Sequence, residues 1–129
     1  MTRLFLFASL LVSVPTFADE KPKQLKYEKK IEMPATEVHQ IIFDSPLVEK
    51  ATVTVNSPGT PINVHFVLES NRKAALTAID DGKAPKDVLG GSEQVKEKVF
   101  EIGPGKKEFT IILWGARKDC DVKVSVTGK

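Results

Sequence analysis

The side chains of this chain that could hold a metal are few and poorly spaced. Its two histidines, His39 and His65, lie far apart in sequence, and neither has the close partners that mark a metal site. The pair Asp80-Asp81 before Gly82 lacks the alternating acidic positions and the distal glutamate of a calcium loop. We therefore expect no metal site and no cofactor, and we expect both histidines to be ordinary surface or hydrogen-bonded residues.

Nucleophilic and phosphate chemistry also lack their usual patterns. The turn Gly-Pro-Gly-Lys at 103–106 is followed by neither the hydroxyl residue nor the helix of a phosphate loop. None of the serines from Ser45 onward lies in a nucleophile-elbow pattern. The sequence thus nominates no catalytic residue.

Trp114 has the clearest potential for binding. It ends an apolar strand and precedes Gly115. It therefore either closes one end of the core, which we favour, or stands exposed at a rim, where a flat apolar ring can stack on a sugar or contact a protein. Asn63 and His65 point outwards from another strand, so the candidate binding residues are Trp114, His65 and Asn63.

The strand that positions Trp114 is predicted at 107–114 and is apolar on both faces. Alternation divides its apolar side chains into two sets, Phe109, Ile111 and Leu113 on one side and Ile112 and Trp114 on the other. Two apolar faces indicate a central strand in a sheet that packs on a second layer.

Strands with one apolar face surround this central strand. Alternating residues predict them at 25–33, 38–43, 51–55, 62–68, 95–102 and 120–126. The strands at 51–55 and 62–68 are expected to form a hairpin. The spacing predicts an all-β fold, an antiparallel β-sandwich of jelly-roll or Greek-key type with about seven to eight strands.

The hydrophobic period changes between Ser70 and Ser92. Apolar residues at helical spacing predict one short helix with an N-cap at Ser70 or Asn71 and an end at Gly82. Residues 83–92 contain a proline and two glycines and are expected to form a surface loop. So short a helix needs packing against the sandwich to persist.

The first residues of the chain have the pattern of a secretory signal peptide. Arg3 precedes an apolar run at 4–14 that is too short for a permanent membrane span, and small residues precede Asp19 where a signal peptidase cleaves. An uncleaved anchor is the alternative. We expect a secreted or periplasmic mature chain without a membrane span, divided as signal peptide at 1–18, flexible basic lead-in at 19–30 and sandwich domain at 31–129.

The net charge argues against one class of partner, and the cysteine content argues against a disulfide. The formal net charge is +2, and no strand interleaves basic with aromatic residues, which argues against nucleic acid as a partner. Cys120 is the single cysteine, so an internal disulfide is impossible. Its alternation with the valines of the last strand predicts a buried, inward-facing thiol that does not react in the native state.

Two pairs of strands carry a family resemblance. The run at 51–68 places Thr-Val-Thr before Ile-Asn-Val-His-Phe-Val, and the turn at 103–105 leads into Phe-Thr-Ile-Ile-Leu-Trp at 109–114, with a last strand at 122–126. These segments resemble the bacterial pre-peptidase C-terminal (PPC) domain. The resemblance implies a β-sandwich module of a secreted protein that binds a surface, a polysaccharide or matrix. Asn63 and His65 stand where that family has acidic and aromatic residues, so calcium binding is not carried over.

These observations favour an exported, non-catalytic β-sandwich module that binds a polysaccharide or a cell-surface protein, or that has a structural role. The alternative is a small secreted enzyme, inhibitor or ligand carrier with a site assembled from scattered residues. A shallow exposed patch would favour the first function, and a deep pocket with converging polar groups would favour the second. Neither the ligand nor the oligomeric state follows from the sequence.

Overall fold

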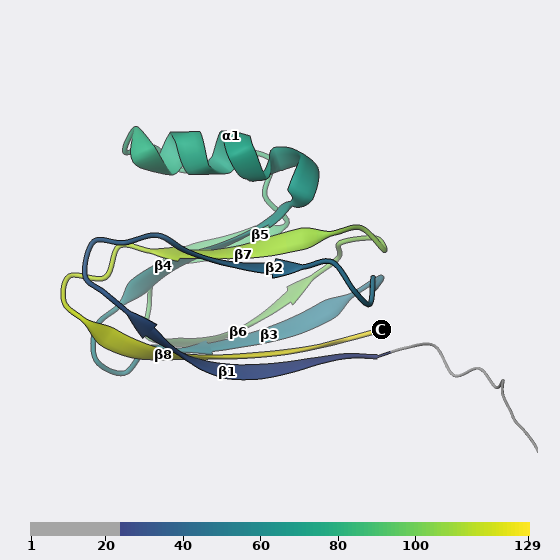
Figure 1. The fold of residues 1–129 in the computed structure, drawn as a ribbon, viewed down its shortest axis with the longest axis horizontal. Coiled ribbons are helices and arrows are strands. Elements are labelled where there is room, and N and C mark those ends of the chain that lie inside the picture. The colour runs from purple at the N-terminus through teal and green to yellow at the C-terminus, as the bar shows by residue number, and fades with distance from the viewer. Residues whose placement is uncertain (1–23) are drawn as a thin grey trace, which may run out of the picture.

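The computed structural model of the chain describes residues 24–129 (Figure 1). These residues form eight strands and one helix, and the strands lie in two four-stranded sheets that face each other. The predicted antiparallel β-sandwich with one short helix is therefore confirmed. The predicted signal peptide at 1–18 lies outside the described residues.

All strand pairs within the two sheets are antiparallel. Sheet A has the order β1 (Leu25–Met33), β8 (Cys120–Gly128), β3 (Ala51–Asn56) and β6 (Glu97–Ile102). Sheet B has the order β2 (His39–Phe43), β7 (Phe109–Trp114), β4 (Ile62–Leu68) and β5 (Gly90–Val95). Apart from the connection through the helix between β4 and β5, every connection crosses from one sheet to the other.

The main core lies between the two sheets and uses the inward-facing residues of each strand. The predicted central strand is β7, which lies between β2 and β4 and begins at Phe109 rather than at residue 107. Phe109 and Leu113 are buried in this core, and the Phe109 ring stacks on Phe43 of β2 with ring centroids 4.9 Å apart. The alternation of the sequence thus identified the inward face of the strand correctly.

The predicted hairpin between 51–55 and 62–68 is wrong, because β3 belongs to sheet A and β4 to sheet B. The segment between them is anchored at Ser57, which is buried. Its hydroxyl donates to the carbonyl of Thr60, and its backbone N–H donates to the carbonyl of Lys96. Alternation looks the same for strands that pair and for strands that face each other across a core, so the sequence pattern could not separate the two arrangements.

Helix α1 (Glu69–Asp80) covers the outer face of sheet B (Figure 1). It follows β4 without a linker, with Leu68 as its N-cap and no side-chain cap, so the predicted cap at Ser70 or Asn71 is wrong. The backbone N–H of Glu69 donates to the carbonyl of Glu108 at 2.9 Å. This bond to the residue before β7 replaces the missing cap.

The two ends of α1 differ in how well the sequence predicted them. The first turn is held by Arg72, whose guanidinium contacts the Glu69 carboxylate at 2.9 Å and lowers the pKa of that carboxyl through hydrogen bonding. The helix ends as predicted at Gly82, whose N–H donates to the carbonyl of Ile79 at 3.0 Å. Gly82 has a φ of 75°, a conformation that glycine adopts without strain.

Two predicted segments, the loop at 83–92 and the lead-in at 19–30, overlap strands of the structure. The stretch 83–92 is not all loop, because β5 begins at Gly90 and pairs with β4. The second half of the expected lead-in at 19–30 overlaps β1, which begins at Leu25 as the alternation at 25–33 predicted and pairs with β8 along its whole length. β5 becomes a strand through hydrogen bonds to β4, which its own periodicity does not encode. Within residues 24–129, no helix has the length and apolarity needed to cross a bilayer.

Candidate functional site

A second, smaller apolar cluster lies between α1 and the outer face of sheet B. Val67 of β4 and Ile112 of β7 point towards the helix, and Ala75 packs on them; all three are buried. The partly buried residues around them are Leu76, Ile79 and Trp114. The small side chain of Ala75 lets the helix approach the sheet closely, so this cluster fixes α1 above the candidate residues.

Trp114 belongs to this second cluster and not to the main core. Alternation along β7 places it on the same face as Ile112, where it remains partly exposed beside Ile79 near the end of α1. The favoured prediction, that Trp114 closes one end of the main core, is therefore wrong. The outer face of sheet B has an apolar layer of its own under the helix, and the indole lies at the margin of that layer.

His65 lies under the indole of Trp114 and is not a surface histidine. The two rings are 4.9 Å apart between centroids and tilted by 32°. The side chain is only 8% exposed, and its Nδ1 atom has no hydrogen-bond partner among residues 24–129. Burial lowers the pKa of the imidazole, and the nearby carboxylate of Glu93 opposes this effect. A neutral imidazole therefore supports the exposed ring.

Asn63 holds the backbone around this pair of rings. It lies opposite Trp114 in the pairing of β4 with β7, and its Oδ1 accepts a hydrogen bond from the N–H of Gln94 at 3.1 Å. Its Nδ2 atom lies beside Gly115, where an added Cβ would come within 2.6 Å. Gly115 also has a φ of 84°. Asn63 is thus a positioning residue that ties the end of β7 to β5.

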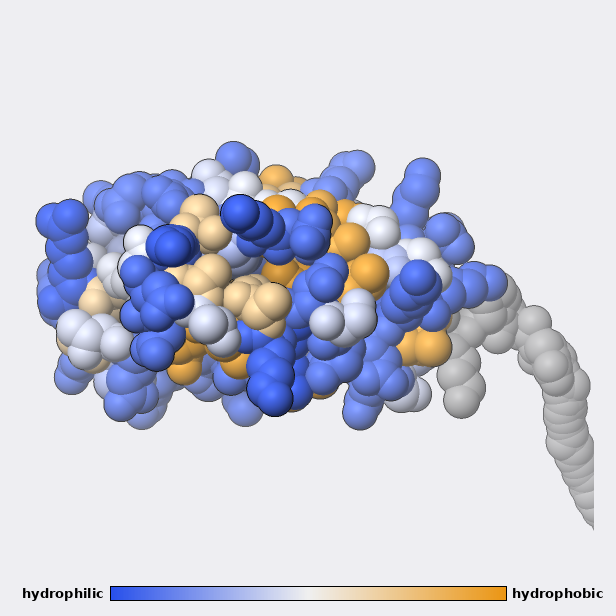
Figure 2. All heavy atoms as spheres, turned by 90° about the horizontal axis from the view of Figure 1, so that it is seen from above, coloured by the Kyte–Doolittle hydropathy of each residue, from blue (hydrophilic) through white to orange (hydrophobic). Residues whose placement is uncertain are grey.

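A shallow groove of about 550 Å³ opens beside Trp114 at the C-terminal end of α1. Its two charged side chains are Asp80, at the end of the helix, and Arg117, in the turn after β7. The complete lining is Thr36, Val38, Ile79, Asp80, Trp114, Gly115, Ala116 and Arg117. Figure 2 looks down onto α1 and shows hydrophobic surface interrupted by hydrophilic residues on this side of the molecule. We call this hollow the Trp114 groove.

The structure brings together the three residues that the sequence nominated, but it gives them different positions. Trp114 lines the groove, His65 supports the indole from below, and Asn63 holds the neighbouring backbone. Asp80 and Arg117 also line the groove, and the sequence nominated neither. No local pattern indicates that the end of the helix and the turn after β7 both border Trp114.

The other candidate residues lie apart from this groove. His39 is on β2 and His65 on β4, with β7 between them, so the two histidines do not form a site. Cys120 faces inwards as predicted but is only partly buried, with its Sγ atom 4.0 Å from the hydroxyl of Ser57. Among residues 24–129 there is no group of three or more histidine, cysteine or acidic side chains placed to hold a metal ion.

A second hollow, of about 590 Å³, lies at the end of sheet A that is distant from Cys120 along β8. The ends of β1, β3, β6 and β8 line it. Two of the lining residues, Ala51 and Gly128, are small and pair with each other across β3 and β8. Its charged lining comes from Lys26, Lys50, Glu101 and Lys129. It contains no aromatic residue, so the Trp114 groove is the better candidate for a ligand that stacks.

No protein-family model matches this chain, and no curated protein matches it.

Proposed function

We propose that this chain is a non-catalytic binding domain that acts outside the cytoplasm and that the Trp114 groove holds a polysaccharide. The observation that carries the proposal is the convergence of a partly exposed indole with two oppositely charged side chains in one open groove. An indole face stacks on the apolar face of a sugar ring, while a carboxylate accepts and a guanidinium donates hydrogen bonds to hydroxyl groups.

The packing around the indole supports this assignment. Trp114 packs against the apolar cluster under α1 and contacts the ring of His65, so little side-chain freedom remains to be lost on binding. Asp80 and Arg117 are exposed and lie at the ends of elements, where a ligand can reach both. The resemblance to PPC-type accessory modules points to the same class of function.

Affinity electrophoresis in gels that contain xylan, mannan or hydroxyethylcellulose tests the proposal. The native protein should be retarded by at least one of these polysaccharides, and Asp80→Ala and Arg117→Ala should each lose most of that retardation. Lys118→Ala is the matched control, because Lys118 is exposed next to Arg117 and does not line the groove. Unretarded migration of the native protein in all three gels, or equal retardation of all variants, would refute the assignment.

Incubation with the same polysaccharides in solution tests the alternative function. Release of reducing ends from a polysaccharide by the native protein would favour the small secreted enzyme over the binding domain. The extracytoplasmic location has an independent test. If the leader is a cleaved signal peptide, the N-terminus of the protein from the periplasm or medium is Asp19, and an intact Met1 there would contradict the location.

A further inference from the structure

The two sheets present four edge strands, and the sequences of these strands differ in how they prevent pairing with other chains. Edge strands expose unpaired backbone N–H and C=O groups, and proteins usually protect them with charged side chains, glycine, proline or bulges. The edges are β1 and β6 in sheet A and β2 and β5 in sheet B.

Three of the four edges carry such protection. β1 has five charged residues, including Lys29 at an inward-facing position, and β6 has three. β5 begins with two glycines, shifts register against β4, and contains Gln94 at a φ of 58°. Charge or irregular backbone therefore disfavours the addition of a strand to β1, β6 and β5.

β2 lacks every one of these protections. Its sequence, His-Gln-Ile-Ile-Phe, contains no charged residue, glycine or proline, and it pairs with β7 in unbroken register. Ile42, the fourth of its five residues, is 50% exposed, with Val38 before the strand at 43% and Leu47 after it at 47%. Val38 and Ile42 thus leave apolar surface exposed at this edge, and Leu47 adds an exposed apolar residue in the segment that follows it.

The surroundings of β2 suit an added strand. A hollow of about 350 Å³ separates Val38 from α1 and is lined on the helix by Lys73, Leu76, Thr77 and Asp80. Arg72 of α1 reaches β2 through a 3.0 Å hydrogen bond to the side chain of Gln40. Side chains of a strand paired with β2 would therefore lie along the flank of the helix, as in other complexes in which a peptide extends a sheet beside a helix.

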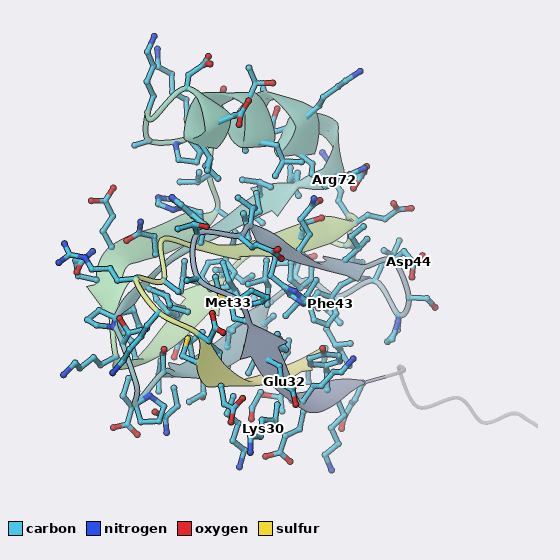
Figure 3. The ribbon with its side chains drawn as sticks, turned by 60° about the vertical axis from the view of Figure 1, so that its left-hand side comes forward. Lys30, Glu32, Met33, Phe43, Asp44 and Arg72 are labelled. Atoms are coloured by element: carbon cyan, nitrogen blue, oxygen red, sulfur yellow. The ribbon has the colours of Figure 1, made fainter. Side chains whose placement is uncertain are left out.

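Charge identifies the kind of strand that fits. Glu37 precedes β2 and Asp44 follows it, and both are exposed. From Ile31 to Glu49, both included, the sequence contains four acidic residues and no lysine or arginine. Figure 3 shows Phe43 pointing between the sheets and Asp44 at the outer end of the strand. A carboxylate therefore lies beyond each end of the free edge, while Lys73 and Arg117 lie near Val38 at its first end.

The same charges argue against a second copy of this chain as the occupant. Antiparallel pairing of two β2 strands brings the start of one strand to the end of the other. Glu37 of each copy would then lie beside Asp44 of its partner, and like charges at such positions are destabilising. A strand from a different protein, with basic residues at its ends, meets the acidic flanks with complementary charge.

We propose that the free edge of β2 binds an extended segment of a partner protein that has alternating apolar residues flanked by lysine or arginine. The segment adds to sheet B as a fifth strand. Its backbone groups pair with those of β2, and its apolar side chains cover Ile42 and Val38. This surface adjoins the Trp114 groove, with which it shares Val38 and Asp80, and its proposed protein partner goes beyond the polysaccharide proposed there.

A synthetic peptide tests the proposal on the full mature chain. The probe is Lys-Val-Thr-Val-Thr-Val-Lys, acetylated and amidated at its ends, added to protein labelled with nitrogen-15. The expected result is that backbone amide signals of residues 38–44 shift on titration and that amides of β2 exchange more slowly with deuterium. The analogue with glutamate in place of both lysines should bind roughly tenfold more weakly, a difference that high salt reduces.

Ile42→Lys is the decisive variant, and Val99→Lys is its control. Val99 is 58% exposed on the edge strand β6, so both substitutions place a lysine on an exposed β-branched edge position. Ile42→Lys should abolish binding of the basic peptide, and Val99→Lys should leave it unchanged, with thermal melts showing that both variants fold. Equal binding by both variants, peptide-induced shifts confined to other strands, or equal binding of the two peptides would overturn the proposal. Dimerisation of the free protein that Ile42→Lys abolishes would also overturn it, in favour of a second copy.

Discussion

The imidazole of His65 and the indole of Trp114 contact each other diagonally across two strands, because Trp114 is paired with Asn63 and His65 with Ile112. The contact stands on the outer face of sheet B, beneath the end of α1, and outside the main core. One residue of this pair is buried and titratable, and the other is partly exposed at the Trp114 groove. The packing of the indole that lines the groove should therefore depend on the protonation of His65, which does not itself line the groove.

The stability of the protein should fall on mild acidification because of His65. Burial holds the pKa of its imidazole below the usual value of about 6.5, so the unfolded chain binds a proton that the folded chain resists. The stability that the neutral ring contributes is complete above about pH 6.5 and is lost as the pH falls towards the folded pKa. Urea denaturation at intervals from about pH 7.5 to 5.5 should show the midpoint decreasing in this window.

Two variants separate this effect from other titrations. His65→Phe keeps an aromatic ring against Trp114 and should remove most of the decrease, whereas His39→Gln, on another strand, should retain it. A decrease of equal size in both variants would assign the pH dependence to other groups. An unchanged midpoint in the native protein would show that the folded state accepts the proton without cost.

Trp114→Ala should lower the free energy of unfolding by about 2 kcal/mol. Truncation of a fully buried tryptophan costs about 3–5 kcal/mol, and Trp114 is only partly buried under α1. Trp114→Phe should recover most of this loss, since a ring still covers His65. Chemical denaturation followed by far-ultraviolet circular dichroism gives both values. A loss below about 0.5 kcal/mol would mean that the indole does not pack in solution as it does here.

Gly115→Ala should destabilise the fold more than Gly105→Ala does. Both glycines have positive φ values, 84° and 64°, so each alanine brings a similar backbone strain of about 1 kcal/mol. A Cβ at Gly115 would also come within 2.6 Å of the Asn63 side chain, whereas a Cβ at Gly105 meets open space. Thermal melts compare the two. Adding Asn63→Ala to Gly115→Ala should cost less than the two single changes together, and strict additivity would show that no clash occurs.

Ala75→Asp should detach α1 from sheet B, whereas Ala74→Asp should have little effect. Ala75 is 1% exposed against Val67 and Ile112, and its neighbour Ala74 is exposed. A carboxylate at 75 would be buried without a partner and should cost about 2 kcal/mol or more. Both substitutions change helix propensity equally, so the difference in denaturation midpoint measures packing alone. Equal midpoints for the two variants would place the contact face of the helix elsewhere.

The predicted parts of the site were those encoded by local alternation. The outward positions of Asn63 and His65 follow from the inward stripe of Ile62, Val64 and Phe66 along one strand. The alternation does not predict that His65 is buried, because the elements that cover it come later in the chain. The same reason explains why Trp114 could be placed on a face of β7 but not assigned to the correct cluster.

The sequence by itself determined the strands other than β5, the helix and the inward faces, because period-2 and period-3.6 patterns are properties of consecutive residues. Only the tertiary structure decided which strands are neighbours, since β3 and β4 have the alternation of a hairpin and yet face each other across the main core. It also decided that α1 covers sheet B, and that Asp80 and Arg117 meet beside Trp114. These relationships depend on packing between residues distant in sequence, and burial energy is non-directional, so no single segment carries the information that fixes them.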